Sequence, residues 1–100
     1  MATLHIAWIL SSNDDRSGDP GACIDNIISA EALTTSGTSA NAAAKPAAAT
    51  HAVVTSLDAN HYVAPYAGAA ATATNSVLIM SGSYHVFKMY GTQVLSAKTA

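Results

Sequence analysis

The sequence predicts an all-β fold, a small antiparallel β-sandwich or jelly-roll-like barrel with little or no helix. Short runs rich in Val, Ile, Thr and Tyr recur along the chain, and clusters of Gly, Pro, Asn, Asp and Ser separate them. The first run alternates, with its large apolar residues on one face, as a half-buried strand does. The chain has 100 residues, which is enough for one core. We therefore expect a single β-domain over residues 1–100.

The N-terminal segment predicts a strand from Thr3 to Leu10. One face of this strand would carry Leu4, Ile6, Trp8 and Leu10. The segment has no basic residue before its apolar run, and the run is too short to cross a bilayer, so it indicates neither a signal peptide nor a membrane span. A polar loop, SSNDDRSGDPG, follows. We interpret residues 1–25 as a strand and loop available as a partner-binding arm, and residues 26–100 as the sandwich body.

The next segments are harder to assign. In residues 22–32 the isoleucines have helical spacing, but their β-branched side chains and the Thr pair that follows favour a strand. Residues 34–40 predict an edge strand with a bulge or turn at Gly37. Residues 42–50 are rich in Ala, but Pro46 interrupts a helix, so we expect an irregular connection with at most one helical turn.

The second half of the chain predicts further short strands. They cover residues 51–57, 61–67, 76–80, 84–90 and 93–97. Asp58–Asn60 is the first turn between them, and residues 68–75 form a loop of small residues. Pro65 indicates an edge or a bulge in its strand, because proline cannot donate to a ladder. Ser76–Met80 is apolar on both faces, which indicates a central strand or an interface.

Candidate chemical sites are weak in this sequence. His51 and His61, with His85 as a third ligand, suggest a metal site, but no close ligand spacing or Cys pair supports it. The Asp-rich N-terminal loop lacks the EF-hand pattern, and no G-x-S-x-G nucleophile motif is present. The single cysteine, Cys23, excludes an intramolecular disulfide. We therefore expect no catalytic residue, no metal, no cofactor and no enzymatic activity.

Charge is sparse: 10% of residues are charged, against roughly 25% in a typical soluble chain. The net charge is −2, and the four basic residues are scattered, so nucleic-acid binding has no electrostatic source. We expect no membrane partner either. So little charge predicts a surface that other proteins cover. The expected interface residues are apolar and aromatic: Leu4, Ile6, Trp8, Tyr62, Tyr66, Val77, Leu78, Ile79, Met80, Tyr84 and Tyr90.

Four segments together carry a resemblance to a known group of proteins. They are TTSGTSA, AAAKPAAA, HAVVTSLDANHYVAPYAG and ATATNSVLIMSGSYHVFKMYGTQVLSA. The region from Ser29 to Ala97 resembles small β-sandwich virion structural proteins of tailed bacteriophages, which include capsid decoration and cement proteins. The resemblance implies a protein made in the host cytoplasm that binds the major capsid protein as a homo-oligomer on the capsid surface. Residues 1–25 lie outside it.

Other functions remain open on the sequence. A head–tail adaptor or tail-associated β-domain would also be part of the virion, but at another position and in fewer copies. A carbohydrate-binding tip module would use Trp8, Tyr62 or Tyr66 as stacking platforms. A small hydrolase is a further alternative. Copy number in particles, and glycan binding by the free protein, distinguish these functions.

Overall fold

A computed structural model describes residues 2–10, 26–42, 45–65, 70–90 and 94–100. These residues contain strands and turns but no helix, so the all-β prediction is confirmed. The strands are β1 (Ala2–Leu10), β2 (Asn26–Thr35), β3 (Ala40–Asn41), β4 (His51–Ser56), β5 (His61–Ala64), β6 (Val77–Ile79), β7 (Tyr84–Lys88) and β8 (Ser96–Thr99).

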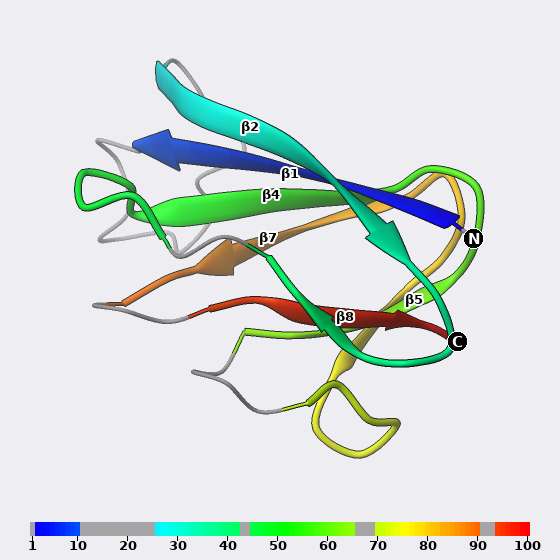
Figure 1. The fold of residues 1–100 in the computed structure, drawn as a ribbon. Helices are drawn as coiled ribbons and strands as arrows, with labels where there is room; N and C mark the ends of the chain where they lie inside the picture. Colours follow the sequence, from blue (N-terminus) through cyan, green and yellow to red (C-terminus); the bar gives the residue numbers. More distant parts are fainter. Residues whose placement is uncertain (1, 11–25, 43–44, 66–69, 91–93) are drawn as a thin grey trace.

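The strands form two four-stranded antiparallel sheets, which pack face to face as a β-sandwich (Figure 1). Their orders are β2-β1-β4-β7 and β3-β8-β5-β6. The β1–β2 and β5–β6 connections stay within one sheet, whereas every other connection crosses between the sheets. The fold is therefore a sandwich with two separate sheets and not a closed barrel.

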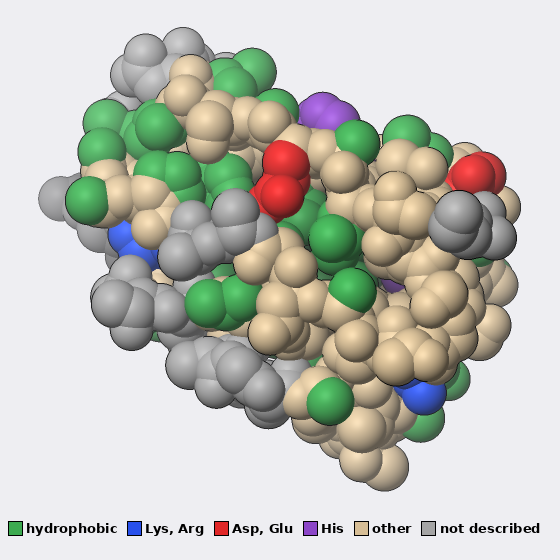
Figure 2. All heavy atoms as spheres, viewed as in Figure 1, with side chains coloured by type: hydrophobic (Ala, Val, Ile, Leu, Met, Phe, Trp, Pro, Cys, Tyr) green, Lys and Arg blue, Asp and Glu red, His purple; other side chains and the backbone are tan. Residues whose placement is uncertain are grey.

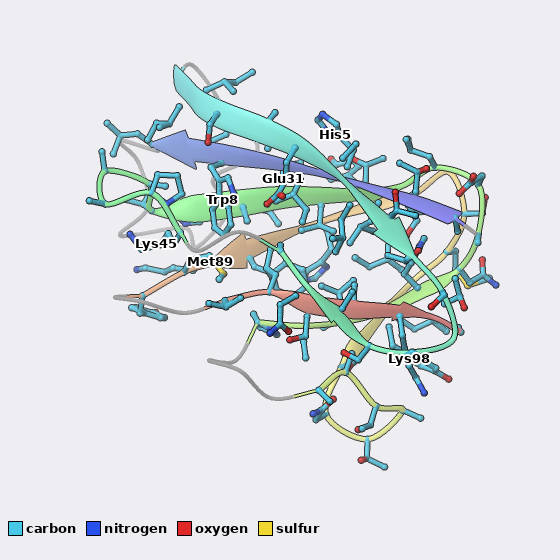
Figure 3. All side chains as sticks on the ribbon, viewed as in Figure 1. His5, Trp8, Glu31, Lys45, Met89 and Lys98 are labelled. Carbon is cyan, nitrogen blue, oxygen red and sulfur yellow. The ribbon has the colours of Figure 1, made fainter. Side chains whose placement is uncertain are left out.

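The core lies between the sheets and takes side chains from both. Alternation along β1 buries Leu4, Ile6 and Trp8, of which Trp8 keeps only 2% of its surface exposed. Sheet β3-β8-β5-β6 contributes Val63 and Ile79. Figure 3 shows Trp8 and Met89 at the same end of the sandwich, and both belong to this core. The predicted face of β1 is thus correct up to Trp8; Leu10, at the strand end, is partly exposed.

The N-terminal strand is not a free arm, contrary to our expectation for its first ten residues. β1 lies between β2 and β4 and pairs with both, so its backbone has no open edge for a neighbouring protein. Leu4, Ile6 and Trp8 face the chain's own core, and their assignment to an interface is a misplacement. An alternating pattern indicates that one face of a strand is covered, but it does not indicate whether the chain's own core or a partner protein covers that face. The polar loop lies outside the described residues.

Three other strand expectations are refined. Residues 26–35 form one continuous edge strand, β2, which confirms strand over helix there; a bend follows at Gly37–Thr38. β5 is central and ends before Pro65, so the proline removes no bond from the ladder. β6 is an edge strand and not a central one. The connection before β4 is irregular, as predicted, with a turn closed by the Ala49 N–H bond to the Pro46 carbonyl at 3.0 Å.

Candidate interaction surface

The edge strands β6 and β7 are consecutive in the chain and belong to different sheets. A tight turn joins them, in which Ser83 N–H donates to the Met80 carbonyl at 2.9 Å and Gly82 has a φ of 83°. Two bonds fix this turn to the end of β4: Gly82 N–H donates to the Ser56 carbonyl at 2.8 Å, and Ser56 N–H donates to the Ser83 carbonyl at 3.0 Å. The free edges of the two sheets therefore meet at one corner of the sandwich.

Five exposed apolar residues lie on or directly beside the strands and the turn that form this corner. We call them the corner patch: Leu57, Val77, Leu78, Met80 and Tyr84. Tyr84 keeps 65% of its surface exposed, Leu57 52% and Met80 51%. The all-apolar run of β6 explains part of the patch, because successive residues of a strand point to opposite faces: Ile79 enters the core, and Leu78 points away from it.

The strand register extends the patch across the outer face of the second sheet. Leu78 on β6 lies directly opposite Tyr62 on β5, and Tyr62 lies opposite Lys98 on β8. Residues opposite each other in a sheet share a face, so these side chains form a row from the apolar corner to a single cation. Tyr62 is half-buried within this row.

Charge is scarce over the described surface. The face in Figure 2 is mostly tan and green, with isolated red and blue side chains. The corner patch itself contains no charged residue; Asp58, next to Leu57 in sequence, accepts a hydrogen bond from Thr3 N–H at 2.9 Å. On β7 the Lys88 ammonium lies 5.7 Å from the centre of the Tyr90 ring, a cation–π distance. A lysine of this kind discourages strand pairing along the β7 edge.

The structure separates the histidines of the suggested metal site. His51 is buried at the start of β4, where its Nδ1 lies 2.8 Å from the Thr50 hydroxyl. His61 is buried at the start of β5, in the other sheet. His85 is exposed on β7 and lies edge-on to Phe87 at 4.6 Å between ring centres. The described residues hold no group of three or more His, Cys, Asp or Glu side chains suited to a metal ion.

The described part of the molecule contains no detectable pocket for a small ligand. Within those same residues, no helix is long and apolar enough to cross a membrane. The corner patch is therefore the best-defined candidate site, and it suits a protein surface better than a small molecule, since it is exposed and apolar and the described residues form no pocket there.

The expected interface residues fall into four groups in the structure. Val77, Leu78, Met80, Tyr84 and Tyr90 are exposed, and all but Tyr90 lie in the corner patch. Tyr62 is half-buried beside the patch, and Ile79 is buried in the core. Trp8 is buried with Leu4 and Ile6, which removes it as a carbohydrate-stacking platform. Tyr66 lies outside the described residues.

Sequence reasoning missed four exposed apolar residues: Leu10, Leu57, Ile27 and Ile28. Leu57 comes directly before the Asp58–Asn60 turn, and this position next to a turn was the feature of the sequence that could have indicated its exposure. The two isoleucines lie near the start of edge strand β2, where a register shift opposite Trp8 and Ile9 leaves Ile28 without a partner in the ladder. Such a bulge cannot be read from a run of apolar residues.

Comparison with known proteins finds no matching family model, no matching curated protein and no matching solved structure. The candidate surface is thus defined by this chain's own residues.

Proposed function

We propose that the protein is a virion structural component of a tailed bacteriophage, a capsid decoration or cement protein that bridges subunits of the major capsid protein. The observation that carries this proposal is the corner patch, a set of exposed apolar side chains with an aromatic member and no charge. Aromatic residues and methionine are enriched, and charged residues depleted, at the centres of protein interfaces.

The size of the patch favours binding in many copies. Full burial of a large apolar side chain contributes ~1.5–3 kcal/mol, and the five patch residues are each about half exposed, so covering them contributes about 4–7 kcal/mol. Association itself costs ~4–15 kcal/mol in lost freedom of motion. A single contact is therefore weak, and a lattice of capsid subunits that engages several contacts at once makes it stable. This favours a decoration protein over a free binding module.

Substitution of the patch tests the proposal on assembled particles. Particles that lack the protein are incubated with the recombinant chain carrying Met80→Asp or Tyr84→Asp, and bound protein is measured by sedimentation. Both variants should lose occupancy, because each places an unpaired carboxylate in an apolar contact. The matched control is Ala47→Asp, which adds the same charge at an exposed turn. This turn precedes the start of β4, whereas Leu57 of the patch follows the other end of that strand. Full occupancy by the folded patch variants, or equal loss with the control, contradicts the proposal.

A head–tail adaptor would use the same kind of apolar surface, but fewer copies of it would be present in each particle. It would occupy the single portal vertex in a few copies, whereas a decoration protein occupies positions repeated over the whole head. The number of chains per particle separates the two functions.

A further inference from the structure

A buried polar cluster joins the two sheets. Thr35 Oγ1, at the end of β2, lies 2.6 Å from Nε2 of His61, at the start of β5. The other ring nitrogen, Nδ1, lies 3.1 Å from Ser56 Oγ, at the end of β4. Ser56 Oγ in turn donates to the Ile79 carbonyl of β6 at 3.2 Å. His61, Thr35 and Ser56 are all essentially without solvent exposure, with at most 1% of their surface accessible.

The direction of the Ser56 bond indicates which nitrogen of the neutral His61 ring carries its proton. Since Ser56 uses its hydrogen on the Ile79 carbonyl, its oxygen accepts from His61 Nδ1–H. Nε2 then carries no proton and accepts the hydrogen of the Thr35 hydroxyl. A neutral ring in this cluster is therefore the Nδ1–H tautomer. A second proton on Nε2 would face the Thr35 oxygen and force that hydroxyl to turn its hydrogen away inside a dry interior.

We propose that Thr35, His61 and Ser56 form a proton-sensitive latch that fastens the two sheets at the end of the sandwich next to the corner patch. The latch adjoins the patch directly: Ser56 precedes Leu57, and Ile79, whose carbonyl accepts from Ser56 Oγ, precedes Met80. Ser56 also holds the β6–β7 turn through its backbone bonds to Gly82 and Ser83. Protonation of His61 weakens the bonds that keep β2 and β4 on β5, and with them the placement of this turn.

Burial lowers the pKa of His61 below its ordinary value of 6.5, because the interior disfavours the charged ring. The Ala59 carbonyl and the charge of Asp58 oppose this effect and raise the pKa, but burial outweighs them. Other titratable side chains on the surrounding strands are His5 on β1, Glu31 on β2, His51 on β4, Tyr62 on β5, Tyr84, His85 and Lys88 on β7, and Lys98 on β8. The ring's hydrogen bonds go to the hydroxyls of Thr35 and Ser56 rather than to these groups.

The sign of the pH dependence follows from this lowered pKa. Above pH 6.5 the ring is neutral in both the folded and the unfolded chain, so the latch contributes fully. As the pH falls below 6.5 the unfolded chain binds a proton that the folded chain does not, so stability falls. The loss continues until the pH reaches the folded pKa and then levels off. The latch is therefore closed at neutral pH and weakens in acid.

Nuclear magnetic resonance of the free wild-type protein tests the latch without any substitution and without a capsid. Nitrogen-15 spectra of the imidazoles should give the Nδ1–H tautomer for His61 and a titration midpoint below 6.5. Amide exchange at Ser56 and Gly82, corrected for intrinsic rates, should lose protection as His61 titrates. An Nε2–H tautomer, a midpoint at or above 6.5, or protection that is unchanged through the titration overturns the proposal.

A variant pair gives a second test of the same protein. His61→Gln is non-titrating, whereas His85→Gln changes an exposed ring and is the matched control. On acidification from neutral pH, the melting temperature of the wild type and of His85→Gln should fall further than that of His61→Gln. Equal falls in all the proteins overturn the latch. If His61→Gln does not fold, the wild-type tautomer and titration decide. Because every measurement uses free protein, its failure leaves the proposed capsid function untouched.

Discussion

Gly82 donates its backbone N–H to the carbonyl of Ser56 at 2.8 Å, which ties the turn between the two sheets to the end of a central strand. This bond places Met80 before the turn and Tyr84 after it on the same corner. Gly82 holds a φ of 83°, in the left-handed region that glycine adopts without strain. The geometry of the corner patch thus depends on one glycine.

Gly82→Ala should lower the free energy of unfolding by ~1 kcal/mol, because alanine resists the left-handed conformation. The cost is conformational, since no heavy atom outside residues 81–83 lies within 4 Å of the added Cβ. Urea denaturation measures it. The control is Gly37→Ala, where the Cβ also meets open space and φ is not left-handed. If both variants lose the same stability, left-handed strain at Gly82 is not the cause.

Trp8→Ala should destabilise the domain by roughly 3–5 kcal/mol, the usual cost of removing a buried aromatic ring. Trp8 is packed within the core between the sheets with 2% of its surface exposed. Leu57→Ala, which truncates an exposed residue, should stay within ~0.5 kcal/mol. Denaturation of the two variants checks this, with tryptophan emission of the native protein as a second readout. Emission like that of free indole in water would place Trp8 outside the core.

Lys45→Met should lower stability by ~1 kcal/mol, because it removes donors from a turn. The Lys45 ammonium donates to the carbonyls of Pro46 at 3.0 Å, Ala47 at 3.3 Å and Ala49 at 2.8 Å. Methionine keeps the length of the side chain and loses only the charged donor. Lys88→Met, on the exposed β7 edge, is the control and should change stability by less than ~0.5 kcal/mol. A similar result at both positions would mean that the carbonyls of the turn are satisfied by water.

Particle binding should persist at raised salt, since apolar burial is not screened and ion pairs are. The corner patch contains no charged residue, so its contact has no ionic component of its own. Occupancy on purified particles is measured over a salt gradient. Release at moderate salt would assign the contact to the few surface charges instead.

The existence of the strands was predictable because alternation and turn clusters are local properties of a sequence. The positions of the strands within the sheets were not. β6 is apolar on both faces, yet it lies at the edge of its sheet. Which strands pair with it depends on the path of the whole chain, and its own residues do not show this. The same limit explains Trp8, whose apolar face suits a partner as well as it suits the chain's own core. Nothing local in the sequence identifies the hydrogen-bond partner of His61, because Thr35 is 26 residues away, in the other sheet.

Quantitative mass spectrometry of purified particles determines whether the proposed decoration protein is a stoichiometric component of the capsid surface. We expect the chain in purified particles at high copy number, in a fixed ratio to the major capsid protein, and we expect it to be lost when Tyr84→Asp is introduced. Absence of the chain from particles would contradict the proposed function, and a few copies per particle would assign it to the head–tail junction instead of the capsid surface.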